Sequence, residues 1–294
     1  MSPHMHPRST RQDAPSRRPW RAAVAAAFGL ASAVALVPAS PASTWAPAAT
    51  AAIHPGVQTH TAGAQCTANF VFTAGSRVFI GQAAHCSGTG GSTETDGCTS
   101  GSLPIGTEVE VTGASKPGHL VYNSWLTMQS LGEADADTCA YNDLALVELD
   151  PADYGKVNPS IPSYGGPTGI NTAGTKAGDR VYSYGNSELR GGIAVLSPKT
   201  GLSLGDQGGG WTHQVYTASP GIPGDSGSAF VDSTGKALGV LSTLALAPLP
   251  LSNNVSDINK MLAYEHAHGP VAVDLAVGTE AFTPKLLGLI PLGL

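Results

Sequence analysis

The chain has 294 residues, of which 41% are hydrophobic and 12% are charged. This is enough apolar material for a packed core, so an intrinsically disordered chain is excluded. Glycine (37 residues) and proline (22 residues) are frequent and follow no fixed repeat. That composition excludes a coiled coil or helical bundle and favours many short strands joined by turns.

The basic residues are unevenly distributed along the chain. Five of the fifteen lie before residue 22, whereas 10 basic and 20 acidic residues follow from residue 22 onward. A body with this excess of negative charge repels phosphate backbones and anionic lipid headgroups, and no run of lysine or arginine follows residue 21. We therefore expect no nucleic-acid partner.

Residues 1–42 are predicted to be an export signal peptide. A basic segment at 16–21 precedes an apolar run at 22–37, and small residues near 39 and 42 offer cleavage sites. A membrane span needs about 20 apolar residues, so a retained anchor is the weaker alternative. The Arg17-Arg18 pair resembles a twin-arginine signal, which leaves the export route open. We expect a secreted, extracellular protein with no stable membrane association after signal cleavage.

The remaining chain indicates an all-β protein. Residues 43–64 have no clear hydrophobic period and are predicted to be a flexible N-terminal arm. Short β-branched and aromatic runs then alternate with turn residues, as in a sandwich or barrel. The predicted strands cover residues 66–73, 77–80, 108–111, 119–131, 143–149, 180–184, 193–196, 211–217, 227–231 and 236–243. One helix is predicted at 256–267, with Ser256 as its N-cap and Gly269 as its stop.

Three motifs carry chemistry. A serine stands between glycines in Gly-Asp-Ser-Gly-Ser at residues 224–228. Glycine allows a sharp turn in which consecutive N–H groups converge on a developing oxyanion. A serine nucleophile also needs a base and an acid that orients the base, and these are His85, in Ala-Ala-His-Cys at 83–86, and Asp143, in Asn-Asp-Leu-Ala-Leu at 142–146. Each motif alone has an ordinary structural explanation, but together they favour a catalytic set of Ser226, His85 and Asp143.

The three motifs resemble those of the trypsin-like, chymotrypsin-fold serine proteases, and the chain is similar to secreted bacterial-type members. The motifs also occur in that family's order of His, Asp and Ser, and the resemblance covers residues 65–243. It implies two antiparallel six-stranded β-barrels with a C-terminal helix. The first barrel would span 65–160 and carry His85 and Asp143, the second would span 161–255 and carry Ser226, and a C-terminal helix and tail would follow at 256–294. We expect the tail to be packed on the body or disordered.

The activity implied by the resemblance is that of a serine endopeptidase. Ser226 would attack the peptide carbonyl and form an acyl-enzyme, His85 would act as base and then as acid, and Asp143 would orient His85. The backbone N–H groups of Gly224 and Ser226 would form the oxyanion hole. We expect polypeptide substrates and a monomer.

Four cysteines in an oxidising compartment indicate disulfides, and spacing alone allows three pairings. The resemblance implies the bridges Cys66–Cys86 and Cys98–Cys139. No cofactor and no metal site is expected, because His266 and His268 point to opposite sides of the predicted helix.

The resemblance places the substrate pocket around Pro220, Ile222, Ser242 and Thr243. Pro220 stands where trypsin-like enzymes carry an acid, so cleavage after small or apolar residues is expected rather than after Lys or Arg. Ser242 resembles the family's serine beside the catalytic acid, although an ordinary strand serine is an equal alternative.

Asp225 needs a partner, because a buried carboxylate must be paired. The sequence leaves open an internal arginine, a hydrogen-bond cage or a newly cut N-terminal amine; the candidate arginines are Arg77, Arg180 and Arg190.

Two other functions fit less well. A secreted binding protein could keep the protease fold without turnover, but the chain retains all three catalytic residue types. A serine esterase of the α/β-hydrolase class would need Gly-x-Ser-x-Gly, where this chain has Ser228 in the last position, and alternating strands and helices, which are missing from the pattern.

Overall fold

The computed structural model describes residues 45–91, 95–245, 252–286 and 290–291. All described residues belong to a single compact unit. The predicted export signal, residues 1–42, lies outside the described residues.

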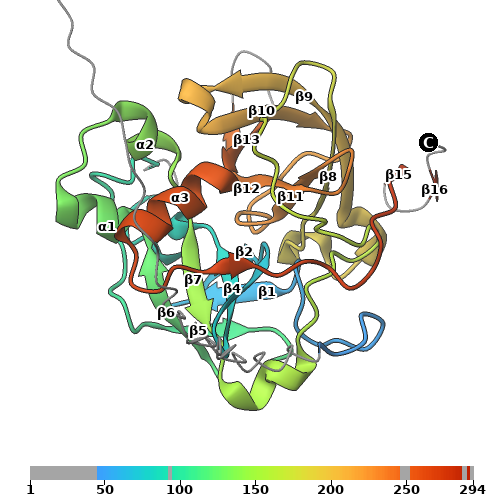
Figure 1. The fold of residues 1–294 in the computed structure, drawn as a ribbon, viewed down its shortest axis with the longest axis horizontal. Helices are drawn as coiled ribbons and strands as arrows, with labels where there is room; N and C mark the ends of the chain where they lie inside the picture. Colours follow the sequence, from blue (N-terminus) through green and yellow to red (C-terminus); the bar gives the residue numbers. More distant parts are fainter. Residues whose placement is uncertain (1–44, 92–94, 246–251, 287–289, 292–294) are drawn as a thin grey trace, which may run out of the picture. The chain divides into compact units, whose positions relative to one another are not determined.

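The first half of the described chain, together with the C-terminal strand β14, builds one antiparallel sheet of eight strands, in the order β14-β3-β4-β7-β6-β5-β1-β2 (Figure 1). The strands are β1 (Gln58–Thr61), β2 (Ala64–Thr67), β3 (Val71–Ala74), β4 (Arg77–Gln82), β5 (Glu108–Val111), β6 (Gly118–Asn123), β7 (Ala145–Glu148) and β14 (Asp274–Leu275). Val71, Ile80, Leu120 and Val147 are among the fully buried side chains that form its core.

The second half closes into a six-stranded barrel in the order β10-β13-β12-β11-β8-β9. Its strands are β8 (Arg180–Tyr184), β9 (Pro198–Gln207), β10 (Thr212–Thr217), β11 (Ala229–Asp232), β12 (Ala237–Ala245) and β13 (Ser252–Asp257). Val181, Val215, Phe230 and Val255 fill the interior and have no solvent exposure. The all-β fold class is confirmed. The first half differs from the expected closed six-stranded barrel, because it contributes seven strands, β1 to β7, and β14 extends them to a sheet of eight.

Residues 45–64 are not the flexible arm that the sequence suggested. Ala46 donates its backbone N–H to the Val157 carbonyl at 2.9 Å, Ile53 has no solvent exposure, and β1 pairs with both β2 and β5. The reason is visible in β1, where Thr59 and Thr61 face the interior and His60 does not. A strand whose inward residues are threonines carries no hydrophobic alternation, so the pattern concealed it.

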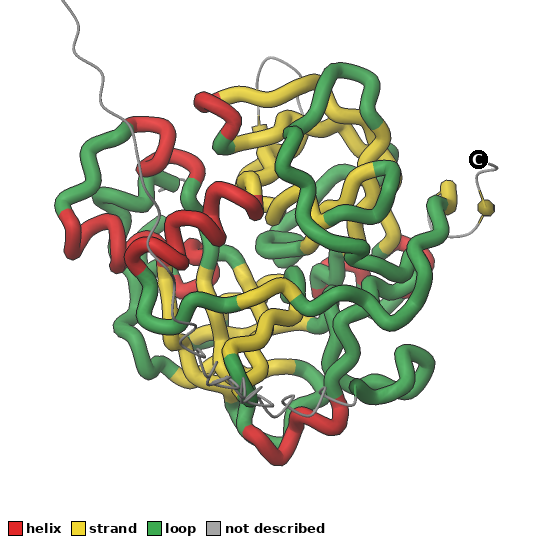
Figure 2. Tube along the Cα trace, viewed as in Figure 1, coloured by secondary structure: helices red, strands yellow, loops and turns green. Residues whose placement is uncertain are grey.

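Three α-helices lie together at one side of the molecule (Figure 2): α1 (Ser124–Leu131), α2 (Ala136–Tyr141) and α3 (Ile258–His268). The strand predicted at 119–131 is correct only as far as Asn123. There the Asn123 side chain accepts hydrogen bonds from the N–H groups of Trp125 and Leu126 and starts α1, which Gly132 ends in a left-handed conformation. The predicted helix at 256–267 is α3, but its N-cap is Asp257 rather than Ser256.

Short 3-10 helices connect these elements: η1 (Ala84–Ser87), η2 (Pro151–Lys156), η3 (Glu188–Arg190), η4 (Ala194–Leu196) and η5 (Gly208–Gly210). The strand predicted at 193–196 is therefore wrong, since this segment forms η4, and the strand begins with β9 at Pro198.

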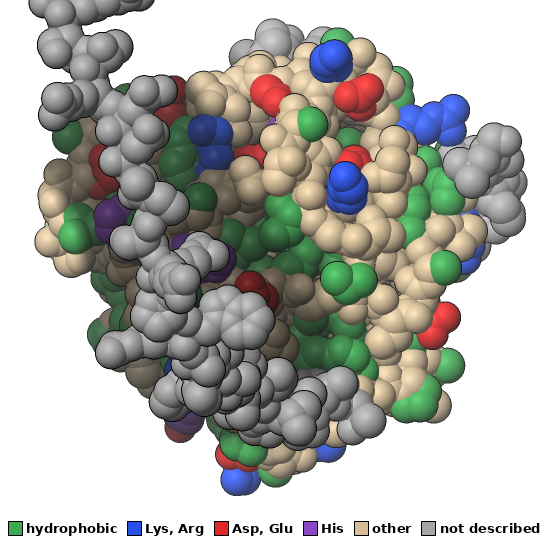
Figure 3. Space-filling view, viewed as in Figure 1, with side chains coloured by type: hydrophobic (Ala, Val, Ile, Leu, Met, Phe, Trp, Pro, Cys, Tyr) green, Lys and Arg blue, Asp and Glu red, His purple; other side chains and the backbone are tan. Residues whose placement is uncertain are grey.

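The C-terminal segment packs on the body in its described part. Its strand β14 pairs with β3, and the Phe282 ring meets the Tyr182 ring edge-on with centroids 5.5 Å apart. Beyond it, β15 (Lys285–Leu286) pairs with β16 (Ile290–Pro291). No helix within the described ranges is long and apolar enough to cross a membrane. On the face drawn in Figure 3, lysine and arginine side chains lie singly rather than in one patch.

Candidate active site

His85 lies in η1, directly after β4. The preceding residues Ala83 and Ala84 are completely buried, which explains why small side chains stand there. The neighbouring Cys86 forms a disulfide with Cys66 of β2. The histidine is thus held between a central strand and a covalent bridge, while a quarter of its side chain stays exposed, 24% by area.

Asp143 lies between α2 and β7 and is almost entirely buried. One carboxylate oxygen accepts a hydrogen bond from Nδ1 of His85 at 2.7 Å and another from the Ser242 hydroxyl at 2.5 Å. The other oxygen accepts the backbone N–H of His85 at 2.9 Å. This pattern fixes both the position of the imidazole and its tautomer, with the proton on Nδ1 and Nε2 free to accept.

The contact between His85 and Asp143 shifts the pKa of both side chains. Burial by itself lowers the pKa of His85, but the charge and hydrogen bond of Asp143 outweigh burial, so the pKa of His85 is raised above its usual 6.5. Burial by itself raises the pKa of Asp143, but His85 and Ser242 together hold that pKa below 3.8. Asp143 is therefore a carboxylate at neutral pH, and a protonated His85 is stabilised.

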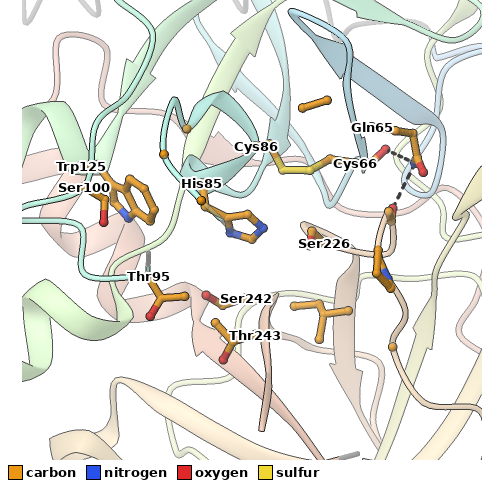
Figure 4. A pocket seen from close by; sticks show the side chains of 18 of the residues that line it. Gln65, Cys66, His85, Cys86, Thr95, Ser100, Trp125, Ser226, Ser242 and Thr243 are labelled. Atoms are coloured by element: carbon orange, nitrogen blue, oxygen red, sulfur yellow. Dashed lines mark hydrogen bonds between the residues drawn. A yellow bond between two sulfur atoms is a disulfide. The ribbon is translucent and has the colours of Figure 1, made fainter. Parts of the chain in front are cut away.

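Ser226 lies in the turn between β10 and β11 and lines the same cleft as His85, a cavity of about 640 Å³ (Figure 4). The imidazole extends toward Ser226, but no direct hydrogen bond joins the two side chains in the structure. Such bonds are often long in unliganded sites and tighten when substrate binds. The structure thus brings the three predicted residues together, two in direct contact and the third across the cleft.

The residues before Ser226 form a tight turn. Asp225 donates its backbone N–H to the Ile222 carbonyl at 2.9 Å, and Gly224 has a φ of +93°. A positive φ at the third position, after proline at the second, defines a type II turn, which requires glycine there. The backbone N–H groups of Gly224 and Ser226 donate to no other described residue, and both residues line the cleft.

The partner of Asp225, which the sequence left open, is a pair of buried cations. Arg190 contacts the carboxylate through its guanidinium, and Nζ of Lys199 lies 2.9 Å from the same oxygen. Lys199 has no solvent exposure. Burial by itself raises the pKa of Asp225, but the hydrogen bonds from Arg190 and the charge of Lys199 outweigh burial, so the pKa is lowered overall. Of the other candidate arginines, Arg77 pairs with Glu148 instead.

Sequence reasoning missed Lys199 and the opposite wall of the cleft. Lys199 follows a proline in a segment where no strand was expected, so nothing indicated its burial. The far wall includes Thr95, Ser100 and Trp125. Trp125 belongs to α1, and its ring centroid lies 6.5 Å from that of His85.

Three of the four predicted pocket residues line the cleft: Ile222, Ser242 and Thr243. Pro220 does not. Its carbonyl instead accepts a hydrogen bond from Nζ of Lys199 at 3.1 Å, because the backbone there turns toward the buried cations. No acidic side chain is among the described residues that line the cleft.

Both implied disulfides are present, Cys66–Cys86 and Cys98–Cys139. They close 20- and 41-residue separations, and each stabilises the fold by about 3–4 kcal/mol, mainly by restricting the unfolded chain. Among the described residues, the two side-chain groups with metal-like spacing each contain cysteines of these bridges. A disulfide sulfur is not a thiolate, so neither group offers a metal site in this oxidation state.

Comparison with known proteins gave structural matches only. No protein-family model matches the sequence, and no curated protein matches it. The structure is similar to Thermobifida fusca Protease A, with a TM-score of 0.50 and 19% identity over 78% of this chain and 100% of that one. A Nocardiopsis protease follows with a TM-score of 0.46 and 17% identity, over 76% and 98% of the two chains.

The match to Thermobifida fusca Protease A and the closed barrel define the fold of the chain. The chain has the chymotrypsin-like fold of the bacterial serine proteases. At this identity the likeness establishes the fold, and function has to be argued from the site.

Proposed function

We propose that the protein is a secreted serine endopeptidase that hydrolyses peptide bonds through Ser226, His85 and Asp143. One observation carries the proposal: in a single cleft, a histidine hydrogen-bonded to a buried carboxylate extends toward a serine that lies in a turn with two uncommitted N–H groups. A serine hydroxyl is a weak nucleophile until an oriented base accepts its proton, and this arrangement provides that base.

In the proposed reaction, Oγ of Ser226 attacks the peptide carbonyl carbon while its proton passes to Nε2 of His85. Asp143 stays ionised and stabilises the imidazolium through Nδ1–H. The N–H groups of Gly224 and Ser226 receive the oxyanion of the tetrahedral intermediate. His85 then protonates the leaving amine, and an acyl-enzyme remains on Ser226. Water, deprotonated by His85, hydrolyses this ester and restores the free serine.

The cleft supports a preference for a small or apolar side chain before the cleaved bond. Ile222 and Leu241 contribute apolar surface, and the described lining contains no carboxylate that could pair with lysine or arginine. A buried cationic side chain without a partner is strongly disfavoured, so basic substrates should react poorly.

Secretion is supported by the two disulfides, because such bridges form and persist in oxidising compartments outside the cytosol. The apolar run at 22–37 after a basic segment supports the same proposal.

The test is hydrolysis of a mixed peptide library by protein purified from the culture medium, with cleavage positions identified by mass spectrometry. We expect cleavage after small or apolar residues and none by Ser226→Ala. Cleavage predominantly after Lys or Arg would overturn the proposed specificity. Absence of cleavage by folded, processed wild-type protein would overturn the endopeptidase and favour a non-catalytic binding protein.

A further inference from the structure

The turn at 222–225, which carries the uncommitted N–H of Gly224 and directly precedes Ser226, is held by side chains outside the catalytic set. Its central carbonyl, that of Pro223, accepts a hydrogen bond from the hydroxyl of Ser187. The next carbonyl, that of Gly224, accepts two more, from Oγ1 of Thr67 at 2.7 Å and from Nε2 of Gln65 at 3.0 Å. Figure 4 shows the Gln65 side chain directed at this turn.

These bonds determine the direction of the Gly224 N–H, one of the two proposed donors to the oxyanion. In a trans peptide the C=O and the following N–H point in opposite directions. Ser187 is buried and is not part of the cleft lining, so a Pro223 carbonyl bound to it points away from the cleft. The N–H of Gly224, on the other side of the same peptide plane, must then point into the cleft.

Without such a bond the peptide could turn over. A type II turn and a type I turn share the same i to i+3 hydrogen bond and differ in the orientation of the central peptide. Glycine adopts either sign of φ with similar ease, so Gly224 alone does not choose between the two turns. In the type I form the Pro223 carbonyl would point toward the place where the oxyanion must develop.

Ser187 is itself firmly placed. Its backbone N–H donates to a carboxylate oxygen of Asp225 at 3.1 Å, and its hydroxyl accepts the N–H of Leu189 at 3.1 Å as the N-cap of η3. The same short helix carries Arg190, which pairs with Asp225. The Ser187 hydroxyl therefore accepts one hydrogen bond from Leu189 and donates its proton to the Pro223 carbonyl in the turn.

Thr67 is oriented in a similar way. Its hydroxyl accepts the backbone N–H of Asn186 at 3.0 Å, which leaves its proton for the Gly224 carbonyl. Because Thr67 belongs to β2, this bond joins the eight-stranded sheet to the turn that carries Ser226.

We propose that Ser187 is a positioning residue that keeps the oxyanion turn in its type II form, with Thr67 and Gln65 as secondary supports. The inference rests on the proposed function and adds to it a determinant of transition-state binding. It also accounts for a preformed oxyanion turn without a contribution from a newly cut N-terminus.

The experiment compares wild type, Ser187→Ala, Ser187→Thr and Thr67→Val in steady-state hydrolysis of a peptide substrate that the wild type cleaves. Ser130→Ala is the matched control, because Ser130 also donates its hydroxyl to a carbonyl, that of Thr127, far from the turn in the sequence and on the exposed face of α1. Thermal melting of each variant separates loss of fold from loss of positioning.

We expect kcat of Ser187→Ala to fall about tenfold while KM stays within about twofold, because the lost bond acts on the oxyanion rather than on substrate binding. Affinity for a peptide boronic acid, whose tetrahedral adduct occupies the oxyanion site, should fall by a similar factor. Ser187→Thr keeps the donor and should recover most of kcat. Thr67→Val should lose less, about threefold, since Gln65 still holds the Gly224 carbonyl. The pH profile should not move, because Ser187 does not contact His85.

Five outcomes decide the matter. A folded Ser187→Ala variant with kcat within twofold of wild type overturns the positioning role, as does an equal loss in Ser130→Ala. A tenfold loss with recovery in Ser187→Thr supports the role. If Ser187→Ala does not fold, Thr67→Val decides, and an unchanged kcat there overturns the inference. A folded wild type that neither cleaves peptide nor binds the boronic acid overturns the proposed function itself, and this result is distinct from the other four.

Discussion

The hydroxyl of Ser242, on a strand of the closed barrel, donates a 2.5 Å hydrogen bond to Asp143, which lies just before β7 of the eight-stranded sheet. The acid of the candidate catalytic set is thus held by residues from both halves of the molecule. His85 supplies the other two hydrogen bonds to the same carboxylate. We therefore regard Ser242 primarily as a support for Asp143 rather than as an ordinary strand serine.

Ser242→Ala should reduce kcat/KM by about tenfold, because a hydrogen bond to a charged group contributes about 1.5–3 kcal/mol and only part of it is expressed in the transition state. The measurement is peptide hydrolysis at neutral pH with thermal melting as a control for folding. An unchanged kcat/KM in a folded variant would contradict a supporting role for Ser242.

The pH dependence of kcat/KM should follow His85, because only its neutral form can accept the serine proton. The pKa of His85 is raised by Asp143 above 6.5, so activity should rise with pH through a midpoint above 6.5. Asp143→Asn removes the negative charge and should lower both that midpoint and kcat, the latter by about 10⁴-fold. A midpoint that does not move in Asp143→Asn would contradict electrostatic coupling of the pair.

The ion cluster at Asp225 predicts an asymmetric effect of substitutions on stability. Asp225→Asn leaves Arg190 and Lys199 buried without a counter-charge and should lower the free energy of unfolding by about 3–5 kcal/mol. Lys199→Met leaves the Arg190–Asp225 pair intact and should cost less. Urea unfolding of the two variants provides the comparison. Equal losses would mean that the two cations do not substitute for one another.

His213 predicts a pH-dependent stability. It has no solvent exposure and bonds Asp206 through Nδ1 at 2.7 Å and Asp257 through Nε2 at 3.0 Å. Burial alone lowers the pKa of His213, but the two carboxylates raise it above 6.5 overall. A raised native pKa means that its stabilisation is complete below about pH 6.5 and is lost as the pH rises through the native value.

The comparison is urea unfolding of wild type and His213→Gln between pH 6 and pH 9. The difference between their unfolding free energies should be largest at pH 6 and shrink toward pH 9. A difference that stays constant, or that grows with pH, would show that folding does not raise the pKa of His213.

The sequence predicted which residues meet in the cleft better than it predicted the residues that support them. His85, Asp143 and Ser226 each lie in a short motif whose neighbours are constrained locally, so their contexts were recognisable. Lys199 and Ser187 act on Asp225 and Pro223 from 26 and 36 residues away in the chain, and such contacts leave no periodic signal.

For the fold, the sequence likewise predicted the elements with a local pattern and missed those that depend on distant contacts. Strands with alternating apolar residues were found, whereas β1 was missed because threonines form its inward face. The sequence pattern predicts a strand through residues 124–131, because Trp125, Leu126 and Met128 are compatible with either a strand or a helix. The Asn123 cap decides for the helix. The pairing of β14 with β3 joins segments that are about 200 residues apart in the sequence. It depends on tertiary contact, so the sequence pattern does not predict it.

The most direct test of the account is labelling of the folded, processed protein with a fluorophosphonate, which reacts with an activated serine, and location of the adduct by mass spectrometry. We predict stoichiometric labelling on Ser226, abolished in Ser226→Ala and strongly slowed in His85→Ala. Labelling on another serine, or none on folded wild-type protein, would contradict the claim that Ser226, His85 and Asp143 form a working catalytic site.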